Sequence, residues 1–226
     1  MCGRLSMTHP TEAMARLFDA APSNDLPDGP RYNICPTQMV GVVTSDAGFR
    51  RYRPMRWGFL PHWYKTPTAG PLLINARAET IAEKPAFRAA CRDRRCLVPA
   101  TGFYEWTSDD DGNRLPWYIH SADGAPLVLA GIWQDWAVAE AQITTLAIVT
   151  CAAGAGLSHI HHREPVSLAP EDWAKWLGED GKGAALLMGP APAERFEAFR
   201  VDRAVNSNRA EGADLIAPLA EQGGQG

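Results

Sequence analysis

The stretch Leu127-Val-Leu-Ala-Gly-Ile-Trp133 decides the fold of this chain. None of its residues carries a charged side chain, so a strand formed here is buried on both faces. Further runs with strand-like composition lie on either side of it, and clusters of turn residues such as Asp46-Ala-Gly48 separate them. The patterns predict strands over residues 39–44, 49–57, 96–106, 115–120, 127–136 and 143–150.

Helix signals are fewer and shorter than strand signals. The chain offers helix candidates over residues 8–18, over residues 78–91, at Pro170 and over residues 194–199. The second candidate is interrupted near Pro85, because proline breaks a helix interior. Strands and helices do not alternate regularly, so we expect an α+β fold. Its sheet is predicted to be mostly antiparallel, curved and barrel-like, with a few short flanking helices.

The composition bounds the class of protein. The 226 residues are 46% apolar and 21% charged, which excludes collagen-like, coiled-coil and largely disordered chains. We expect one domain over residues 1–220 and a disordered tail over residues 221–226. The chain has no run of about 18 apolar residues, and its first ten residues lack the apolar core of a secretion signal. We therefore expect a cytoplasmic protein with no membrane partner.

The cysteines argue against disulfide bonds and against zinc. Their number is odd and they form no close pairs, which fits a reducing compartment: Cys2, Cys35, Cys91, Cys96 and Cys151. There is no C-x-x-C motif, and the three histidines at 159, 161 and 162 lack a helical H-E-x-x-H pattern. We expect no metal site and no cofactor.

Charge is distributed unevenly along the chain. The net charge is −4, but residues 50–95 hold 11 basic and 3 acidic residues, so this segment carries +8 and the remainder −12. Such a segment can form an anion-attracting face on an acidic protein, as in a nucleic-acid-binding protein. An ordinary solvated surface explains the same charges.

Cys2 is the most informative position for chemistry. Removal of Met1 would leave a cysteine with a free α-amine, whose pKa of about 8 is well below the 10.4 of lysine. An aldehyde meeting this 1,2-aminothiol forms a Schiff base, and the thiol then closes a thiazolidine ring. Internal cysteines cannot do this. The alternative is that Cys2 is simply a small apolar residue buried beneath the sheet.

Three further residues are candidates for acid–base or positioning roles. His161 lies in a loop with three imidazoles, and imidazole titrates near neutral pH. Glu105 ends an apolar strand among aromatic residues, where burial would raise its pKa. Asn75 follows an apolar run and can both donate and accept hydrogen bonds. Each residue also has a purely structural interpretation. His161 could be a structural histidine, Glu105 could form a buried ion pair with an arginine, and Asn75 could be a turn former.

Aromatic and basic residues are interleaved between Arg56 and Tyr64. Exposed aromatic side chains beside arginines suit the stacking of unpaired bases, although a core strand and loop fit as well. We expect Trp57 in the core and Trp63 and Tyr64 on the surface, because a loop rich in proline, threonine and glycine follows them.

Several motifs in order along the chain resemble the SRAP (SOS response-associated peptidase) family, over residues 2 to about 218. The matching stretches are Cys2-Gly-Arg4, Arg31-Tyr-Asn-Ile-Cys-Pro-Thr37, Arg56-Trp-Gly58, Ile74-Asn-Ala-Arg-Ala-Glu-Thr80, Arg94-Arg-Cys-Leu-Val-Pro99, Gly102-Phe-Tyr-Glu-Trp106, Ile160-His-His-Arg-Glu-Pro165 and Val205-Asn206.

The resemblance implies a monomeric sensor that binds abasic sites in single-stranded DNA and crosslinks to the ring-opened sugar through a thiazolidine. It implies that Cys2 is the nucleophile, that Asn75 holds it or the sugar, and that Glu105 handles the amine proton. His161 would be the acid–base group at the sugar oxygen. Removal of Met1 by self-cleavage and strand cleavage by β-elimination are further implied activities. The DNA contacts implied are phosphate contacts by Arg4, Arg77 and Arg163, and a stacking wedge formed by Trp63 and Tyr64.

Two positions depart from the family pattern. Glu164 stands where Met or Arg is more usual, and a carboxylate there is expected to weaken phosphate binding. Cys35 replaces a frequent alanine and is expected to be a small buried residue.

Two other functions remain open. Met-Cys-Gly also opens the class II glutamine amidotransferases, and a thiol amidohydrolase or peptidase would use the same cysteine. Against an amidotransferase, the chain lacks a synthetase-like second domain and an Asn-Gly-Asp oxyanion site. The third hypothesis, a non-catalytic single-strand-binding module, predicts salt-sensitive binding that does not depend on Cys2.

Overall fold

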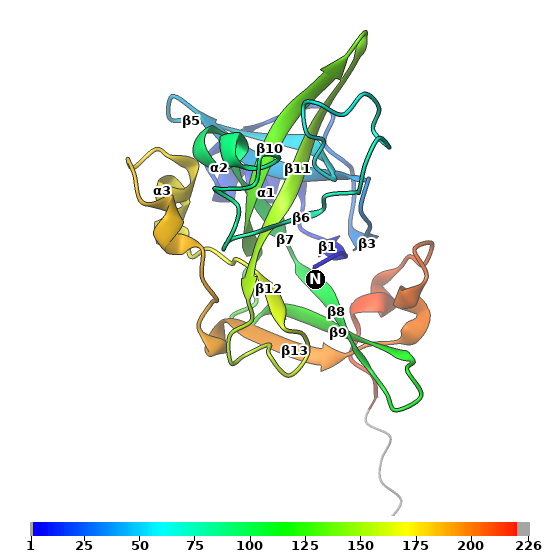
Figure 1. Cartoon of the computed structure of the whole chain (residues 1–226). Coiled ribbons are helices and arrows are strands. Elements are labelled where there is room, and N and C mark those ends of the chain that lie inside the picture. The colour runs from blue at the N-terminus through cyan, green and yellow to red at the C-terminus, as the bar shows by residue number, and fades with distance from the viewer. Residues whose placement is uncertain (1, 221–226) are drawn as a thin grey trace, which may run out of the picture.

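The computed structural model describes residues 2–220 (Figure 1). The predicted tail over residues 221–226 therefore lies outside the described residues. The strands are β1 (Leu5–Met7), β2 (Ala20–Pro22), β3 (Arg31–Ile34), β4 (Met39–Asp46), β5 (Phe49–Trp57), β6 (Asn75–Arg77), β7 (Arg95–Ala100), β8 (Gly102–Ser108), β9 (Arg114–Ser121), β10 (Leu127–Val138), β11 (Ala141–Ala152), β12 (Arg163–Pro165) and β13 (Phe196–Arg200). The α-helices are α1 (Thr11–Leu17), α2 (Arg88–Asp93) and α3 (Trp173–Leu177). Short 3₁₀ turns are η1 (Pro170–Asp172), η2 (Ala184–Leu187), η3 (Ala193–Arg195), η4 (Arg203–Asn206) and η5 (Ala213–Ile216).

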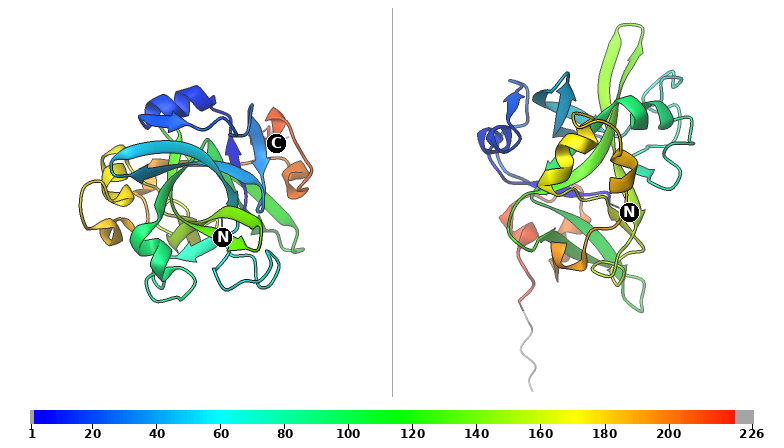
Figure 2. Two further views of the ribbon diagram at one scale, coloured as in Figure 1. Left: turned by 90° about the horizontal axis from the view of Figure 1, so that it is seen from above. Right: turned by 90° about the vertical axis from the view of Figure 1, so that its left-hand side faces the viewer.

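Five strands form a closed barrel. The order β11-β10-β7-β4-β5 is antiparallel throughout, and a short parallel pairing of β11 with β5 closes the ring. Figure 2 shows this ring from above. Strand β6 also pairs in parallel with β11, just beyond the residues of β11 that pair with β5. Strand β12 pairs antiparallel with the last residues of β11. The predicted α+β class with a mostly antiparallel, barrel-like sheet and few short helices is confirmed.

A second sheet packs below the barrel in the view of Figure 1, with the order β13-β9-β8-β1-β3. The strand predicted over residues 96–106 is divided between the two sheets, because the chain turns at Thr101 and continues from β7 into β8. The first strand, β1, lies between β8 and β3 and so holds the start of the chain inside this sheet.

Alternate residues on the barrel strands form two cores. One apolar cluster includes Val42, Met55, Val98 and Leu129, and we assign it to the barrel interior because inward and outward residues alternate in a closed sheet. The other covers the outer face beneath α1, α2 and α3. Cys2 and Leu5 belong to the interior cluster, so the N-terminal segment enters one end of the barrel.

Two helix predictions were wrong. Residues 194–199 begin with a 3₁₀ turn and continue as β13, which pairs with β9. Within residues 78–91 only the end is helical: α2 starts at Arg88, and turns occupy the segment around Pro85. Among the described residues, no helix combines the length and apolar character needed to cross a membrane.

Candidate active site

Cys2 lies at the mouth of the barrel and is only 1% exposed. Its carbonyl oxygen accepts a hydrogen bond of 2.8 Å from the side-chain amide of Asn75. Asn75 begins β6, which is fixed beside β11 by its parallel register with Ile148. The sequence-predicted pairing of Asn75 with Cys2 is therefore present, and it is made through the main chain of the cysteine.

Burial and charge both act on the Cys2 thiol. Removal from water raises its pKa, and the negative charge of Glu105 acts in the same direction. Glu105 lies on β8 and is 4% exposed. Burial likewise raises the pKa of the Glu105 carboxyl. The thiol is therefore held in its neutral form at neutral pH.

His161 stands in a loop that is fixed to the barrel mouth by Leu157 and Ile160, which both pack in the interior cluster. Its Nδ1 accepts a hydrogen bond of 2.9 Å from the backbone N–H of Arg163. Burial is the main reason why the pKa of His161 is lowered. The imidazole of His162 stacks on that of His161, with ring centroids 4.3 Å apart.

A pocket of about 340 Å³ has both Glu105 and His161 in its wall. Its lining residues are Gly3, Arg4, Glu105, Trp106, Ser108, Arg114 and His161. The pocket thus joins the two candidate acid–base residues to the segment that directly follows Cys2. The indole of Trp106 lies in the pocket wall together with the guanidinium groups of Arg4 and Arg114.

Arg114 is a pocket residue that sequence reasoning missed. Its guanidinium carbon lies 4.4 Å from the ring centroid of Trp106, within cation–π distance. The antiparallel pairing of β8 with β9 places Ser108 opposite Arg114. The turn signal Asp109-Asp-Asp-Gly112 between two predicted strands pointed to this hairpin, from which the proximity could have been inferred.

The predicted phosphate-binding arginines differ in their surroundings. The guanidinium of Arg4 donates to Asn33 Oδ1 at 2.6 Å, to the Val205 carbonyl at 2.9 Å and to Asn208 Oδ1 at 2.6 Å. Arg77 ends β6 with an exposed side chain. The basic groups are therefore not equally available to a ligand.

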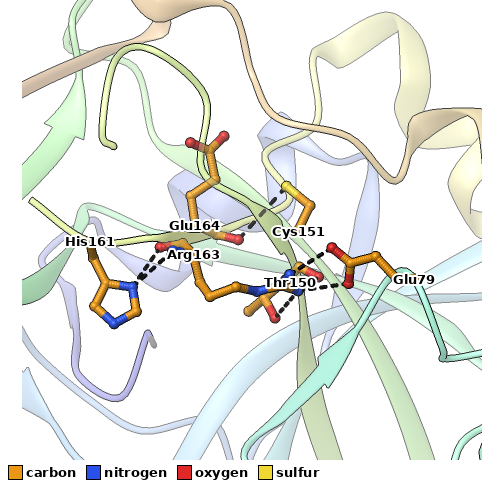
Figure 3. A network of polar contacts seen from close by, with 6 residues as sticks. All are labelled: Glu79, Thr150, Cys151, His161, Arg163 and Glu164. Atoms are coloured by element: carbon orange, nitrogen blue, oxygen red, sulfur yellow. Dashed lines mark hydrogen bonds and ion pairs between the residues drawn. The ribbon is translucent and has the colours of Figure 1, made fainter. Parts of the chain in front are cut away.

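Arg163 is joined to Glu79 by two hydrogen bonds of 2.6 and 2.9 Å (Figure 3). It also donates to the carbonyl oxygen of Thr150 at 2.7 Å. The guanidinium lowers the pKa of the Glu79 carboxyl to about 2. Since Glu79 is half-exposed, a ligand phosphate can compete with its carboxylate for Arg163.

The two departures from the family pattern are both buried. Glu164 is 1% exposed, and its carboxylate points away from the guanidinium of Arg163 (Figure 3). The sequence predicts that Glu164 weakens phosphate binding, but the structure turns its carboxylate away from the place where a phosphate would meet Arg163. Cys35 is 7% exposed, in keeping with a small buried residue, and its thiol lies 3.6 Å from the carbonyl oxygen of Asn33.

Trp63 and Tyr64 lie in the loop that follows β5. The Trp63 side chain is 48% exposed, Tyr64 is half-buried, and Trp57 is fully buried in the barrel. The indole N–H of Trp136, on β10, donates to the Tyr64 carbonyl at 2.8 Å. The loop is thus tied to the β10–β11 hairpin while Trp63 stays available for stacking.

No group of three or more His, Cys, Asp or Glu side chains within residues 2–220 is arranged to hold a metal ion. The groups that converge on the pocket can transfer protons, stack and donate hydrogen bonds.

Comparison with known proteins identifies the class. The chain belongs to the SOS response associated peptidase (SRAP) family, whose pattern matches residues 1–208. It is 33% identical to the abasic site processing protein YoaM of Bacillus subtilis, over 96% of this chain and 97% of that protein. It is also 33% identical to the abasic site processing protein YedK of Escherichia coli, over 97% of this chain and all of that protein.

Similarity extends to an animal protein and to a solved structure. The abasic site processing protein HMCES of Rattus norvegicus is 30% identical, over 96% of this chain and 76% of that protein. A crystal structure of a Bacteroides thetaiotaomicron protein superimposes with a TM-score of 0.85 at 25% identity, covering 97% of this chain and all of that one.

Proposed function

We propose that this chain processes abasic sites in single-stranded DNA by capturing the sugar aldehyde on Cys2 after removal of Met1. The observation that carries the proposal is the convergence of Glu105 and His161 on one pocket beside the Cys2 segment. The names of the relatives, all abasic site processing proteins, supply the substrate class.

The pKa values favour the α-amine as the first nucleophile. Because burial raises the pKa of the Cys2 thiol, the thiolate is scarce at neutral pH, whereas a free α-amine has an ordinary pKa of about 8. The amine adds to the aldehyde carbon, and loss of water gives an imine. The sulfur then adds to the imine carbon, and the thiol proton ends on the nitrogen. A thiazolidine ring results, with one water molecule released overall.

Glu105 and His161 are proposed to move the protons in these steps. Glu105 has a raised pKa, which makes its carboxylate a stronger base toward the amine. His161 supplies a proton to the sugar ring oxygen as the ring opens. Asn75 holds the main chain of Cys2 so that amine and thiol face the same carbon. We also assign β-elimination from the imine to these residues. Release of Met1 is assigned to them as hydrolysis of the Met1–Cys2 peptide bond, with water rather than the Cys2 sulfur as the attacking group, which frees the α-amine of Cys2.

The DNA contacts follow from exposure. Arg77 is exposed and meets a phosphate directly, and Arg163 does so by exchanging Glu79 for phosphate. Arg4 lines the pocket but is only 6% exposed, and its guanidinium is held by Asn33, Val205 and Asn208, so it shapes the pocket wall rather than meeting a phosphate directly. Trp63, with Tyr64 beside it, stacks on a neighbouring base. An unpaired lesion in a single strand is easily displaced into the pocket.

The thiol environment distinguishes this proposal from a glutamine amidotransferase. Such an enzyme attacks an amide with its cysteine sulfur, which requires an activated thiol of lowered pKa. Burial and the Glu105 charge raise the pKa of the Cys2 thiol instead. Glutamine hydrolysis by the pure protein is therefore not expected.

The first prediction tests Cys2. Protein shown by intact mass to lack Met1 is mixed with a single-stranded oligonucleotide bearing one abasic site, and a heat-stable adduct is expected. Cys2→Ala should form none. Cys2→Ser and Cys2→Ala both keep the α-amine and lack the thiol that closes the ring, so borohydride should still trap the imine of each. Cys35→Ala, which changes another small buried cysteine, should react like the unaltered protein. Undiminished heat-stable adduct with Cys2→Ala would reject the mechanism.

A further inference from the structure

Glu164 is a buried carboxylate that the proposed chemistry does not use. Its Oε2 accepts a hydrogen bond of 2.9 Å from the backbone N–H of Gly154, and its Oε1 accepts one of 2.9 Å from the backbone N–H of Ala191. A buried carboxylate is unfavourable unless such donors satisfy it. Here the donors are main-chain amides from two separate segments, so the side chain joins three parts of the chain.

These bonds bracket the loop that carries His161. Gly154 lies near the start of that loop, and Glu164 follows its end by two residues. The backbone N–H of Ala153 also donates to the carbonyl of His162 at 3.1 Å. A Cβ on Gly154 would lie 3.1 Å from Pro190 Cβ, so the loop start packs tightly against the segment that holds Ala191. The loop is therefore closed across its base.

Only a carboxylate fits this arrangement. Two N–H donors converge on the side chain from opposite segments, and an ionised carboxylate offers an acceptor oxygen to each. A glutamine at the same position has one acceptor, and its NH₂ group would face the other N–H. A methionine offers no comparable acceptor to either.

We propose that Glu164 is a positioning residue that fixes the imidazole of His161 at the pocket by clamping the base of its loop. The role of His161 in the reaction rests on the proposed function, whereas the clamp is a property of the protein alone. The titratable or charged groups around His161 also influence its titration. They are His162, Arg163, Glu105, Arg4 and Arg114.

The second prediction uses nuclear magnetic resonance titration of the histidine rings in DNA-free protein, with the His161 signal assigned from His161→Asn. Loosening the loop admits water, so Glu164→Gln should raise the apparent pKa of His161 toward about 6.5. Glu164→Met should do so further. Asp123→Asn is the matched control, because Asp123 also accepts a backbone N–H, in the turn between β9 and β10. It should leave the titration unchanged.

The reaction supplies an independent readout. With Glu164→Gln, adduct formation at saturating DNA should slow by on the order of tenfold, while affinity for an oligonucleotide with a non-reactive abasic analogue stays the same. Circular dichroism checks that each variant is folded. An unchanged His161 titration in a folded Glu164→Gln protein, or an equal shift in Asp123→Asn, overturns the clamp. Failure of the unaltered protein to form any adduct would instead reject the proposed function, and the titration would still decide the clamp.

Discussion

Glu105 combines a buried position with a charge that the proposed reaction needs. Burial raises the pKa of its carboxyl, so the folded state disfavours the ionised form relative to the unfolded state. Stability linked to this group is greatest below the ordinary glutamate pKa of about 4.3 and is lost as the pH rises through the raised value. The ionised Glu105 carboxylate that the proposed reaction needs therefore lowers the stability of the folded protein.

The third prediction follows from this sign. Glu105→Gln removes the ionisable group, so the unfolding free energy of the unaltered protein should fall relative to that of the variant as the pH rises. Urea unfolding at a series of pH values measures the difference. The variant should also form adduct much more slowly. A difference in unfolding free energy that does not change with pH would contradict the assignment.

Sequence reasoning finds the residues of the site more readily than their partners. Glu105 stands out because it ends an apolar strand, and His161 because it lies in a loop with three imidazoles. Both line the same pocket. The partners of Arg4 are less accessible to such reasoning, because Asn33 and Asn208 lie 29 and 204 residues away. Likewise the sequence places Glu164 directly after Arg163 and so predicts interference with phosphate binding. The direction of its carboxylate is set by backbone N–H groups of Gly154 and Ala191, which the sequence does not reveal.

At the scale of elements, the β10–β11 hairpin supports the loop that carries Trp63. The indole N–H of Trp136 holds the Tyr64 carbonyl, and the side-chain amide of Gln134 donates to the Leu60 carbonyl at 3.2 Å. Figure 1 shows the hairpin projecting beyond the barrel next to this loop. A rigid support reduces the entropy that the loop loses when it stacks on a base.

The fourth prediction concerns this support. Trp136→Phe removes the N–H donor and leaves the Tyr64 carbonyl without it, which costs about 1 kcal/mol. The loop should be cleaved faster by protease, and affinity for single-stranded DNA should fall, while the adduct rate at saturating DNA is unchanged. Trp173→Phe is the matched control, because the Trp173 indole nitrogen has no hydrogen-bond partner among the described residues. Equal loss of DNA affinity in both variants would contradict this role.

Elements were predicted best where the pattern is long. The strands expected over residues 39–44, 49–57 and 127–136 appear as β4, β5 and β10. Turn residues bound these segments, and residues 127–133 are continuously apolar. Strands of three or four residues, such as β1 and β6, carry no such pattern. Their conformation is set by neighbouring strands rather than by local preference.

At the scale of the whole molecule, the basic segment does not act as one face. Arg50 pairs with Glu179, and Arg94 and Arg95 donate to backbone carbonyls. These charges are used to hold the fold together, so the +8 of residues 50–95 overstates the charge available to DNA.

The fifth prediction is a shallow salt dependence of DNA binding. If Arg77 and Arg163 each neutralise one phosphate, while the buried and hydrogen-bonded Arg4 does not, the logarithm of the binding constant should fall with the logarithm of salt concentration with a slope of about −1.4. Fluorescence anisotropy at several salt concentrations measures it. Arg77→Ala should reduce the slope by about 0.7, whereas Arg51→Ala, at an exposed position on β5, should not. An equal effect of both variants would mean that diffuse charge, not placed contacts, drives binding.

The hydrogen bonds of Arg4 join distant parts of the chain, since this residue precedes β1 and its guanidinium reaches Val205 and Asn208. During synthesis these hydrogen bonds therefore cannot form until Asn208 has been added. At a ribosomal rate of 5–20 residues per second, that interval is about 10–40 s. Until then, the pocket residue Arg4 lacks two of the acceptors that hold its guanidinium in place.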